Sequence, residues 1–437
     1  MVNSFKIGEI IETSVTEVSY QGLGVERRSD VTIFTLGLFI GEKAKVKVFY
    51  KTSKLLFCYP IEITHSHALR KFIPSHNLLM SNIAPFLPFS YNVSKEWKRD
   101  YLRQQFKWNF PNKCIEFSEI VPAPFEYHNR NKVKYFIEIK DGKAYFAVNR
   151  FNSTQKLIVE KEQMQKTINK NLSSALNLLL EYLNSDLAEK EIKKLISISG
   201  RINTKNEVQV LLEVTNDLDF SKIEKRIKSI PEVISLSILL DSKYKKVLEK
   251  KPFEIKILDK SFIVDIQSFF QTDTLAFEGM LNFLKSIIDL SKFRRIIDLY
   301  CGTGVIGISL KNEEQILVGM DISEHSINNA KMNAHKNKQQ NTAFYAGDVS
   351  DNLRQININS EDLVILDPSR DGLEDKTIED LSQLNVQNVL YISCNPRTLI
   401  RDLKKFSFEG YSFDQVSGFD NFPFTPHIES VVLLSKK

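Results

Sequence analysis

Cysteine is scarce in this sequence, with four residues among 437. Cys58, Cys114, Cys301 and Cys394 lie far apart, and no two of them form a C-x-x-C pair. This spacing argues against a disulfide framework and against a zinc site, and it favours the reducing cytoplasm. With so few thiols, each can be weighed separately as a candidate nucleophile.

Long hydrophobic runs are missing as well. No stretch approaches the roughly 18 to 20 uninterrupted apolar residues that a membrane-spanning helix needs. The N-terminal segment MVNSFKIGEIIE has no apolar core of the kind found in signal peptides. We therefore expect a cytoplasmic protein without a membrane contact, and the sequence predicts no obligate protein partner.

The chain is long enough for two or three domains, and 42% hydrophobic residues are ample for packed cores. The net charge of +5 is small, but residues 66–108 alone hold seven basic against two acidic side chains, interleaved with eight aromatic rings. Cations meet phosphates and rings stack on bases, so this stretch suits an RNA-binding surface. The alternative is a solvated helix over an aromatic core.

Two regions precede the C-terminal part. Residues 1–65 contain short β segments separated by glycines, the pattern of a small β-barrel of the oligonucleotide-binding kind. Residues 66–262 predict a mixed α+β domain. Within it, two apolar segments flank Asp141-Gly142, which favours a tight hairpin turn. We expect both regions to bind RNA.

Residues 263–437 predict a doubly wound α/β domain of Rossmann-like form. Near-continuous apolar strands alternate with helical stretches, as in a parallel sheet buried on both faces. The final run ESVVLLSKK follows its neighbour across a loop too short for a crossover helix, so it is expected to return antiparallel. The residues that end the five parallel strands are Asp298, Asp321, Asp348, Asp367 and Cys394.

Ligands of open α/β sheets bind beyond the carboxyl ends of the strands. There, DLYCGTGVIG (298–307) predicts a strand, a glycine-rich turn and a helix start, and Gly302 and Gly304 let the backbone approach a ligand closely. The spacing excludes a triphosphate cradle and suits a dinucleotide or S-adenosylmethionine equally, with Asp321 placed for ribose hydroxyls. The alternative is a turn that only packs a helix on a strand.

Asp367 ends its strand in ILDPSRDGL. A lone aspartate at such a position is often only a turn former, but here it joins three other acids at the same edge. The NPPY signature of amino-group methylation on bases is absent.

Cys394 ends the fifth strand, and Asn395-Pro396 then turns the chain. A thiol there faces the pocket, and a nearby helix N-terminus is expected to lower its pKa. The alternative is that a free cysteine is a small buried hydrophobe. The antiparallel last strand brings His427 and Glu429 beside this loop, which places a proton-accepting carboxylate next to a thiol. Cys301, the rival nucleophile, lies inside the glycine turn and is expected to pack against the ligand.

Together these residues resemble the RNA 5-methyluridine methyltransferases, the bacterial ribosomal and transfer RNA uracil-5-methyltransferases. The resemblance spans nearly the whole chain, and the N-terminal barrel looks like a TRAM domain. The matching segments, in order, are EYHNRNKVK (126–134), QSFFQTDTLAFEGM (267–280), DLYCGTGVIG (298–307), DPSRDGL (367–373), SCNPRTLIRDL (393–403) and FPFTPHIESVVLL (422–434).

The resemblance implies a role for ten residues. Cys394 becomes the nucleophile and Glu429 the base. Phe269 is implied to line the pocket for the flipped uracil, and Arg130 to lie near the RNA. The implied contacts to S-adenosylmethionine are Gln271, Tyr300, Val305, Asp321, Asp348 and Asp367.

The reaction explains why a thiol and a carboxylate are needed. Carbon 5 of uracil is too weak a nucleophile to take a methyl group from a sulfonium. Thiolate attack at carbon 6 places electron density on carbon 5, and a base must later remove the carbon 5 proton so that the thiol can leave. The target base is expected to be flipped out of its stack.

The sequence departs from the family pattern in a few places. Many members hold an iron–sulfur cluster on four cysteines, three of them clustered. Here Cys58 and Cys114 alone precede the methyltransferase region, so no cluster is expected. His128 stands where arginine is usual, Ser369 where proline is usual, and Asp321 where glutamate is common.

We therefore predict a cytoplasmic, S-adenosylmethionine-dependent RNA uracil-5-methyltransferase. The TRAM-like barrel favours 23S ribosomal RNA over transfer RNA as the substrate, by analogy. A catalytically silent RNA-binding or folding factor is an alternative that the intact Cys394 and Glu429 disfavour. A small-molecule methyltransferase is disfavoured by the barrel and by the basic aromatic stretch. The sequence does not identify the target uridine.

Overall fold

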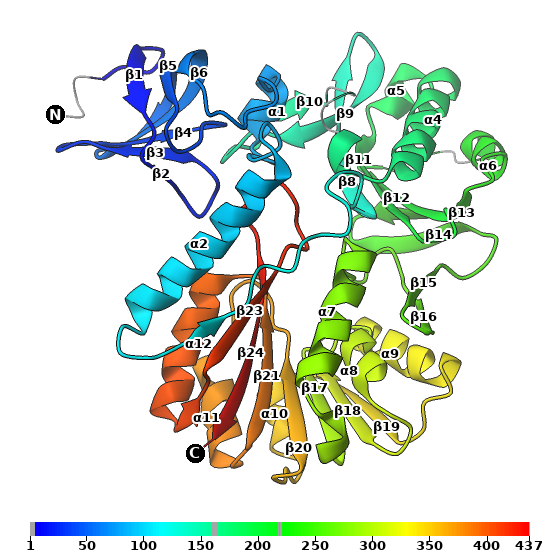
Figure 1. Ribbon diagram of the computed structural model, residues 1–437. Helices are drawn as coiled ribbons and strands as arrows, with labels where there is room; N and C mark the ends of the chain where they lie inside the picture. The colour runs from blue at the N-terminus through cyan, green and yellow to red at the C-terminus, as the bar shows by residue number, and fades with distance from the viewer. Residues whose placement is uncertain (1–4, 160–161, 163–164, 217, 219–220, 437) are drawn as a thin grey trace.

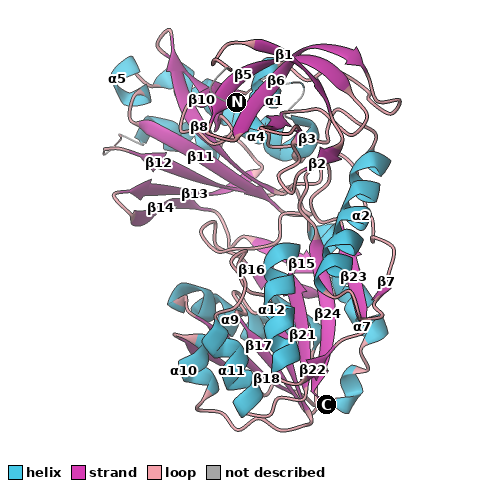
Figure 2. Cartoon of the chain, turned by 90° about the vertical axis from the view of Figure 1, so that its left-hand side faces the viewer, coloured by secondary structure: helices cyan, strands magenta, loops and turns pink. Residues whose placement is uncertain are grey.

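The computed structural model describes residues 5–159, 162, 165–216, 218 and 221–436. In these ranges the strands form sheets of six, seven, two and nine strands. Figures 1 and 2 show the N-terminal and central sheets above the sheet of the last third of the chain. Within the same ranges, no helix combines the length and apolar content that crossing a membrane requires.

The N-terminal sheet curls back on itself. Its ladder runs β1-β5-β6-β4-β3-β2, and β1 and β2 are separated by just Val15 and Thr16. One bent strand therefore supplies both edges, and a closed, barrel-like sheet results. Inward residues alternate along β5, where Ala44, Val46 and Val48 are buried. The strands are β1 (Ile10–Ser14), β2 (Glu17–Val18), β3 (Gly24–Arg27), β4 (Thr32–Thr35), β5 (Lys43–Lys51) and β6 (Leu55–His65).

The central sheet has the order β10-β9-β8-β11-β12-β13-β14, and only its β12–β13 pair is parallel. The predicted hairpin at Asp141-Gly142 is confirmed, since both residues have positive φ and join β8 to β9. The elements are β8 (Lys132–Lys140), β9 (Lys143–Asn149), β10 (Lys156–Ile158), η2 (Gln165–Thr167), α4 (Lys170–Asp186), α5 (Glu189–Ile192), β11 (Leu195–Ile202), β12 (Val208–Val214), α6 (Ser221–Lys228), β13 (Val233–Leu240) and β14 (Lys243–Glu249).

The C-terminal sheet has the order β19-β18-β17-β20-β21-β24-β23-β7, with β22 also pairing β24. Strands β17 to β21 are parallel, and β24 returns antiparallel beside β21, as predicted. Its strands are β17 (Arg295–Leu299), β18 (Ile316–Asp321), β19 (Thr342–Ala346), β20 (Asp362–Leu366), β21 (Asn388–Ser393), β22 (Tyr411–Ser412), β23 (Gln415–Phe419) and β24 (Glu429–Lys436).

Helices cover both faces of this sheet (Figure 2). They are α7 (Thr274–Ile287), η3 (Leu290–Lys292), α8 (Val305–Leu310), α9 (Glu324–Lys336), α10 (Val349–Leu353), α11 (Asp375–Gln383) and α12 (Pro396–Phe408). A short hairpin of β15 (Glu254–Ile257) and β16 (Lys260–Ile263) packs on α9. The backbone of Ile263 exchanges two hydrogen bonds with the Asn333 amide, so this hairpin belongs with the C-terminal unit.

An early segment also joins the C-terminal unit. Helix α1 (His76–Ser81) is followed by the long helix α2 (Tyr91–Asn109), which packs on α12, and by β7 (Glu116–Phe117), which extends the sheet beside β23. The boundaries expected at residues 66 and 262 therefore do not follow the packing. The reason is that a helix and an edge strand of this sheet are encoded far upstream of its other strands.

The aromatic rings of residues 66–108 are mainly core residues. Phe86, Phe89 and Trp97 belong to the core shared with the central sheet, whereas Phe106 packs in the core of the C-terminal sheet. The interpretation as a solvated helix over an aromatic core therefore holds for these rings, and their burial removes them from a base-stacking surface. Trp108 is 66% exposed and is an exception.

A buried ion pair fastens α2 to the C-terminal unit. Lys98 donates to a carboxylate oxygen of Asp420 and to the backbone oxygen of Phe422 at 2.9 Å, and both charged side chains are fully buried. Burial lowers the pKa of Lys98, while the charge of Asp420 opposes that shift. The pair therefore ties the loop between β23 and β24 to a helix more than 300 residues upstream.

Breaking this pair should destabilise the protein strongly. Asp420→Asn leaves the Lys98 ammonium unpaired in a dry site, and we expect the free energy of unfolding to fall by about 3 to 5 kcal/mol. Urea unfolding, followed by tryptophan fluorescence, measures the free energy of unfolding, because Trp97 precedes Lys98 on α2 and reports on this region. Lys246→Met, which removes the exposed Lys246–Glu249 pair, should cost under about 1 kcal/mol. Equal losses in the two variants would contradict this expectation.

Candidate active site

The carboxyl ends of the strands bring several predicted residues into one row. Strand β17 pairs in parallel with β18 on one side and with β20 on the other. In this register Tyr300 lies between Asp321 on one side and Asp367 on the other at the sheet edge. Strand β24 is antiparallel to β21, and Ser393 pairs with Ser430. That register sets Cys394 opposite Glu429 at the same edge.

The glycine-rich turn after β17 is fixed by an acid of the neighbouring strand. The Gly302 N–H donates to a carboxylate oxygen of Asp321 at 2.9 Å, and the other oxygen of Asp321 accepts from the Ser323 N–H. Tyr300, Gly302 and Gly304 all have positive φ. A Cβ added at Gly302 would meet no atom within 4 Å, so the turn faces open space.

Asp298 lies beneath this turn. Its side chain is fully buried, and one carboxylate oxygen accepts from the Gly307 N–H at 2.8 Å, whereas the other has no partner in the described structure. Burial raises the pKa of Asp298 to about 7. A partnerless polar atom beside an open glycine turn fits a ligand with polar groups, as the expected S-adenosylmethionine has.

Gly302→Ala should weaken S-adenosylmethionine binding roughly tenfold. The new methyl group enters the open space at the turn, and an alanine at φ +53° is strained by about 1 kcal/mol. Isothermal titration calorimetry measures the affinity. Gly279→Ala in α7 is the matched control, because its Cβ also meets no atom within 4 Å and its helical backbone is unstrained. Unchanged affinity in Gly302→Ala would show that the cofactor does not bind at this turn.

Cys394 lies between β21 and α12 and is partly buried. Burial raises the pKa of its thiol to about 11, and the charges of Glu429 and Asp367 add to the shift, while the guanidinium of Arg370 opposes it. The net pKa of this thiol is therefore raised, in contrast to the lowering expected from a helix N-terminus, because desolvation and two acids dominate. At neutral pH the group is a thiol that needs help to ionise.

Glu429 begins β24 and is 2% exposed. Burial raises the pKa of its carboxyl well above the usual value, Asp367 raises it further, and Arg370 lowers it. Burial also raises the pKa of Asp367. Two neighbouring carboxyls in a desolvated site cannot both be ionised easily, so one of them carries a proton near neutral pH.

Sequence reasoning assigned no role to Arg370, although it lies inside the quoted segment DPSRDGL. Its charge acts on both Cys394 and Glu429, and it lines the same cleft as the thiol. The backbone oxygen of Arg370 accepts from the Asn395 amide at 2.9 Å and from the Thr398 hydroxyl at 3.2 Å. A charged residue three positions after a strand-end aspartate was the signal that could have identified it.

The cleft at Cys394 has a volume of about 650 Å³. His427 contributes to its wall. Burial lowers the pKa of His427 to about 4, and the charges of Arg370, Lys98 and Arg130 lower it further. The imidazole is therefore neutral at pH 7. Arg130, predicted to lie near the RNA, is partly buried and does not line this cleft.

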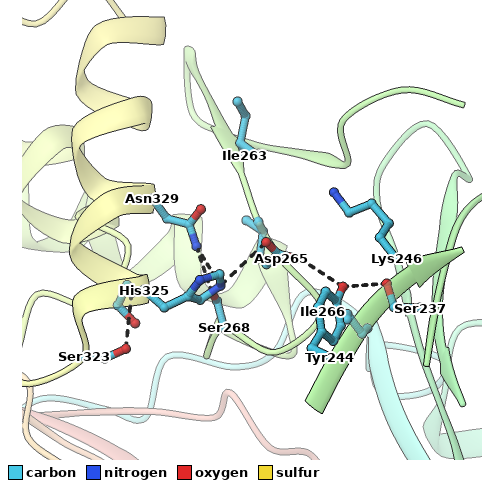
Figure 3. A network of polar contacts seen from close by, with 12 residues as sticks. Ser237, Tyr244, Lys246, Ile263, Asp265, Ile266, Ser268, Ser323, His325 and Asn329 are labelled. Carbon is cyan, nitrogen blue, oxygen red and sulfur yellow. Dashed lines mark hydrogen bonds and ion pairs between the residues drawn. The ribbon is translucent and has the colours of Figure 1, made fainter. Parts of the chain in front are cut away.

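Phe269 and Gln271 lie on the loop that joins β16 to α7. Side chains of the central sheet hold its backbone. Arg201 donates to the oxygens of Asp265 and Ser268, and Asn131 donates to the oxygen of Gln271 at 3.1 Å. Figure 3 shows the other anchors of this loop, in which Asn329 contacts Ser268, and Asp265 lies between His325 and Tyr244.

Not all predicted residues meet at the cleft. Phe269 is 71% exposed and is not part of the cleft wall. Val305 is buried at the first turn of α8. Asp348 is exposed and caps α10 by accepting from the Asp351 N–H at 3.1 Å, so a helix-capping role accounts for it.

The other cysteines do not line the cleft at Cys394. Cys301 is buried against the sheet, and burial raises the pKa of its thiol well above the usual value. Cys58 is buried in the N-terminal sheet and Cys114 is exposed. Across the described ranges, no three or more His, Cys, Asp or Glu side chains gather in a way that would hold a metal ion.

Comparison with known proteins assigns the chain to a family. A family model described as tRNA (Uracil-5-)-methyltransferase matches residues 90–437, which is most of the chain. The chain belongs to this methyltransferase family. The match begins at the start of α2, in agreement with the packing of α2 and β7 on the C-terminal sheet.

Relatives align with nearly the whole chain. An uncharacterized RNA methyltransferase of Caldanaerobacter subterraneus subsp. tengcongensis is 27% identical over 450 residues, covering 98% of this chain and 99% of that protein. The 23S rRNA (uracil(1939)-C(5))-methyltransferase RlmD of Mannheimia succiniciproducens is 25% identical, covering 99% of this chain and 97% of that protein.

A solved structure shares the fold. The tRNA (uracil-54, C5)-methyltransferase of Pyrococcus abyssi, crystallised with S-adenosyl-L-homocysteine, superposes with a TM-score of 0.73 at 20% identity, covering 97% of this chain and 100% of that chain. The predicted α/β fold with a Rossmann-like sheet is confirmed at this level. The family match makes this protein an S-adenosylmethionine-dependent RNA (uracil-5-)-methyltransferase.

Proposed function

We propose that the protein methylates carbon 5 of a uridine in 23S ribosomal RNA through a covalent adduct with Cys394. The observation that carries the proposal is the strand register that sets the Cys394 thiol opposite the buried Glu429 carboxyl, with Arg370 acting on both. A nucleophile and a base at one sheet edge match the two proton-coupled steps of this reaction.

The Cys394 thiol first gives its proton to water, and Arg370 stabilises the thiolate. The sulfur bonds to carbon 6 of uracil, which breaks the 5,6 double bond and leaves an enolate with electron density on carbon 5. S-adenosylmethionine, when bound, would supply the methyl group to that carbon, with cleavage of its sulfur–methyl bond and departure of S-adenosylhomocysteine. Glu429 then removes the carbon 5 proton, the double bond re-forms and the thiolate leaves. Glu429 takes this proton in its ionised form, with the shared proton of the pair on Asp367, and a carboxylate with a raised pKa is then the stronger base.

Six residues are proposed to hold the cofactor, and the open turn at Gly302 and the partnerless oxygen of Asp298 support this location. Asp321 is proposed to take ribose hydroxyls while it fixes the turn. Asp348 has the weakest support, since it already caps a helix. The proposed set is Gln271, Tyr300, Val305, Asp321, Asp348 and Asp367.

Ribosomal RNA is proposed as the substrate because the N-terminal barrel suits a TRAM domain and because a 23S rRNA methyltransferase aligns over nearly the full chain. Phe269 is proposed to contact the flipped uracil from its exposed loop, and Arg130 to lie beside the RNA. The reaction is proposed to occur in the cytoplasm. Transfer RNA is the second candidate, favoured by the tRNA methyltransferase that shares the fold.

Methyl transfer from labelled S-adenosylmethionine tests the proposal. The RNA substrates are unmodified transcripts of 23S ribosomal RNA and of transfer RNAs. Nucleoside analysis of each RNA then identifies the methylated product. We expect 5-methyluridine in the 23S transcript. If 5-methyluridine forms in transfer RNA alone, transfer RNA is the substrate in place of ribosomal RNA. A different methylated nucleoside, or none, would overturn the proposed reaction.

The first chemical step should accelerate with pH. Since the Cys394 thiol has a pKa of about 11, raising the pH increases its thiolate fraction, and the rate of adduct formation should rise about tenfold per pH unit between roughly 6.5 and 9. Arg370→Met removes the charge that lowers this pKa and should slow the step at every pH in this range. Rapid-quench measurements with 5-fluorouridine RNA report the rate. A flat profile would contradict the raised pKa.

A further inference from the structure

The cleft at Cys394 is larger than one pyrimidine ring. Its volume of about 650 Å³ lies within the range of pockets for drug-sized ligands. Several distant parts of the chain form its wall: the loop after β2, the segment from α1 to α2, Phe151 after β9, and the loops around Arg370, Cys394 and His427. A flipped uracil at Cys394 leaves the part of the cleft beside the N-terminal barrel unfilled.

Charge in this cleft favours a polyanion. Its wall contains Arg370, Arg397 and Arg401 and no acidic side chain. Arg401 is held by Asp402 and by two backbone oxygens. Arg397 is exposed, and among the described residues no acid pairs with it. Its guanidinium is therefore available to a phosphate group.

Two tyrosines give this part of the cleft flat apolar surfaces. The guanidinium of Arg397 lies over the Tyr20 ring, 4.4 Å from its centroid, and the Tyr20 side chain is half exposed. Tyr101 also lines the cleft, and its ring stacks on Trp97 at 5.0 Å. An arginine-backed aromatic ring with an accessible face is a platform for base stacking.

The Tyr20 loop is locked against the catalytic domain. Gly22 has a positive φ, and a Cβ there would approach the Pro85 ring to 2.5 Å and the Pro426 ring to 3.6 Å. The Asn82 amide also donates to the backbone oxygen of Gln21 at 3.0 Å. Tyr20 is therefore held at the cleft by backbone contacts of its loop, and its side chain stays half exposed beside Arg397.

We propose that Tyr20, Tyr101 and Arg397 form a subsite for a nucleotide that flanks the methylated uridine. The flanking base stacks on Tyr20, and its phosphate contacts Arg397. This inference rests on the proposed function and extends it, because it makes a residue of the N-terminal barrel part of the active-site wall. The subsite recognises RNA one nucleotide away from the reacting base.

A cycle of protein and RNA changes tests the subsite. The substrate is the shortest fragment of the transcript that the wild-type protein methylates, made intact or with an abasic nucleotide on either side of the target. For wild type we expect kcat/KM to fall about tenfold with one of the two abasic RNAs. On intact RNA, kcat/KM of Tyr20→Ala should be lower than that of wild type by a similar factor, mainly through a higher KM. Replacing the intact RNA by that abasic RNA should then lower kcat/KM of Tyr20→Ala by less than about twofold.

Control variants separate stacking from structure. Tyr20→Phe should behave as wild type because it keeps the ring. Tyr182→Ala removes a matched arginine–tyrosine contact with Arg226 at 4.9 Å, remote from the cleft, and should change neither value. Arg397→Met should reduce the salt dependence of RNA binding by about one phosphate contact.

The possible outcomes are distinct. If the abasic RNA lowers kcat/KM by the same factor in wild type and in Tyr20→Ala, the ring acts only in packing, and the subsite is overturned. No effect of either abasic nucleotide on wild type would overturn it too. Absence of methyl transfer to any RNA by wild type would overturn the proposed function, and the subsite with it.

Discussion

Cys394→Ala should abolish methyl transfer and should no longer form a covalent complex with 5-fluorouridine RNA. The thiol is the proposed bond-forming atom, and removal of a nucleophile that acts with a base typically costs roughly four orders of magnitude or more in rate. With the wild-type protein, a base cannot remove the fluorine at carbon 5 in the way that it removes a proton. The adduct should therefore persist and migrate as a protein–RNA band in a denaturing gel.

The control for this variant is Cys114→Ala, which changes an exposed thiol outside the site. It should keep both activities. Binding of S-adenosylmethionine should be unchanged in Cys394→Ala, which shows that the fold is intact. A covalent complex that survives in Cys394→Ala would dismiss the assignment, and Cys301 in the glycine turn would then be the next thiol to test.

Glu429→Gln should stall the reaction after methyl transfer. The amide keeps the shape of the buried side chain but cannot accept the carbon 5 proton, so the thiol cannot be eliminated. We expect a methylated protein–RNA adduct to accumulate with ordinary uridine RNA, and multiple turnover to slow by about 10² to 10⁴. Labelled S-adenosylmethionine followed by denaturing gel electrophoresis detects the trapped species.

The matched control is Glu374→Gln, which makes the same chemical change at an exposed residue beside α11. It should leave turnover and adduct levels at wild-type values. If Glu429→Gln instead prevents adduct formation, Glu429 acts before the methyl transfer, for example on the thiol proton. Normal turnover in that variant would remove Glu429 from the mechanism.

The candidate site was largely predictable because parallel strands expose their terminal residues at one edge. Asp321 and Asp367 stand at the ends of apolar strands, whereas Asp298 lies inside β17 and Tyr300 takes the edge position. The short final loop indicated the antiparallel direction that sets Glu429 opposite Cys394. These inferences need strand direction and spacing alone. Local pattern carries that information because a buried parallel strand is a nearly continuous apolar run.

Other features depend on contacts between distant parts of the chain. The partner of Lys98 is 322 residues away, so no local pattern indicated that this lysine is buried. An amphipathic helix can bury its rings in a core or expose them to RNA, and the sequence of α2 fits both until its neighbours are known. The pKa of Cys394 likewise depends on Glu429 and Asp367, which three-dimensional packing brings near.

The position of β7 has a consequence for how the chain is made. Helix α2 and β7 leave the ribosome long before β23 and β24, yet β7 forms the edge beside β23, and Lys98 needs Asp420 to neutralise it. The catalytic sheet is therefore completed only when the last strand has been synthesised, so an incomplete chain contains Cys394 without Glu429. A fragment starting at residue 263 would in turn expose the β23 edge and bury an unpaired aspartate. The sheet that carries the nucleophile and the base thus combines an upstream segment, α2 and β7, with the last strands of the chain.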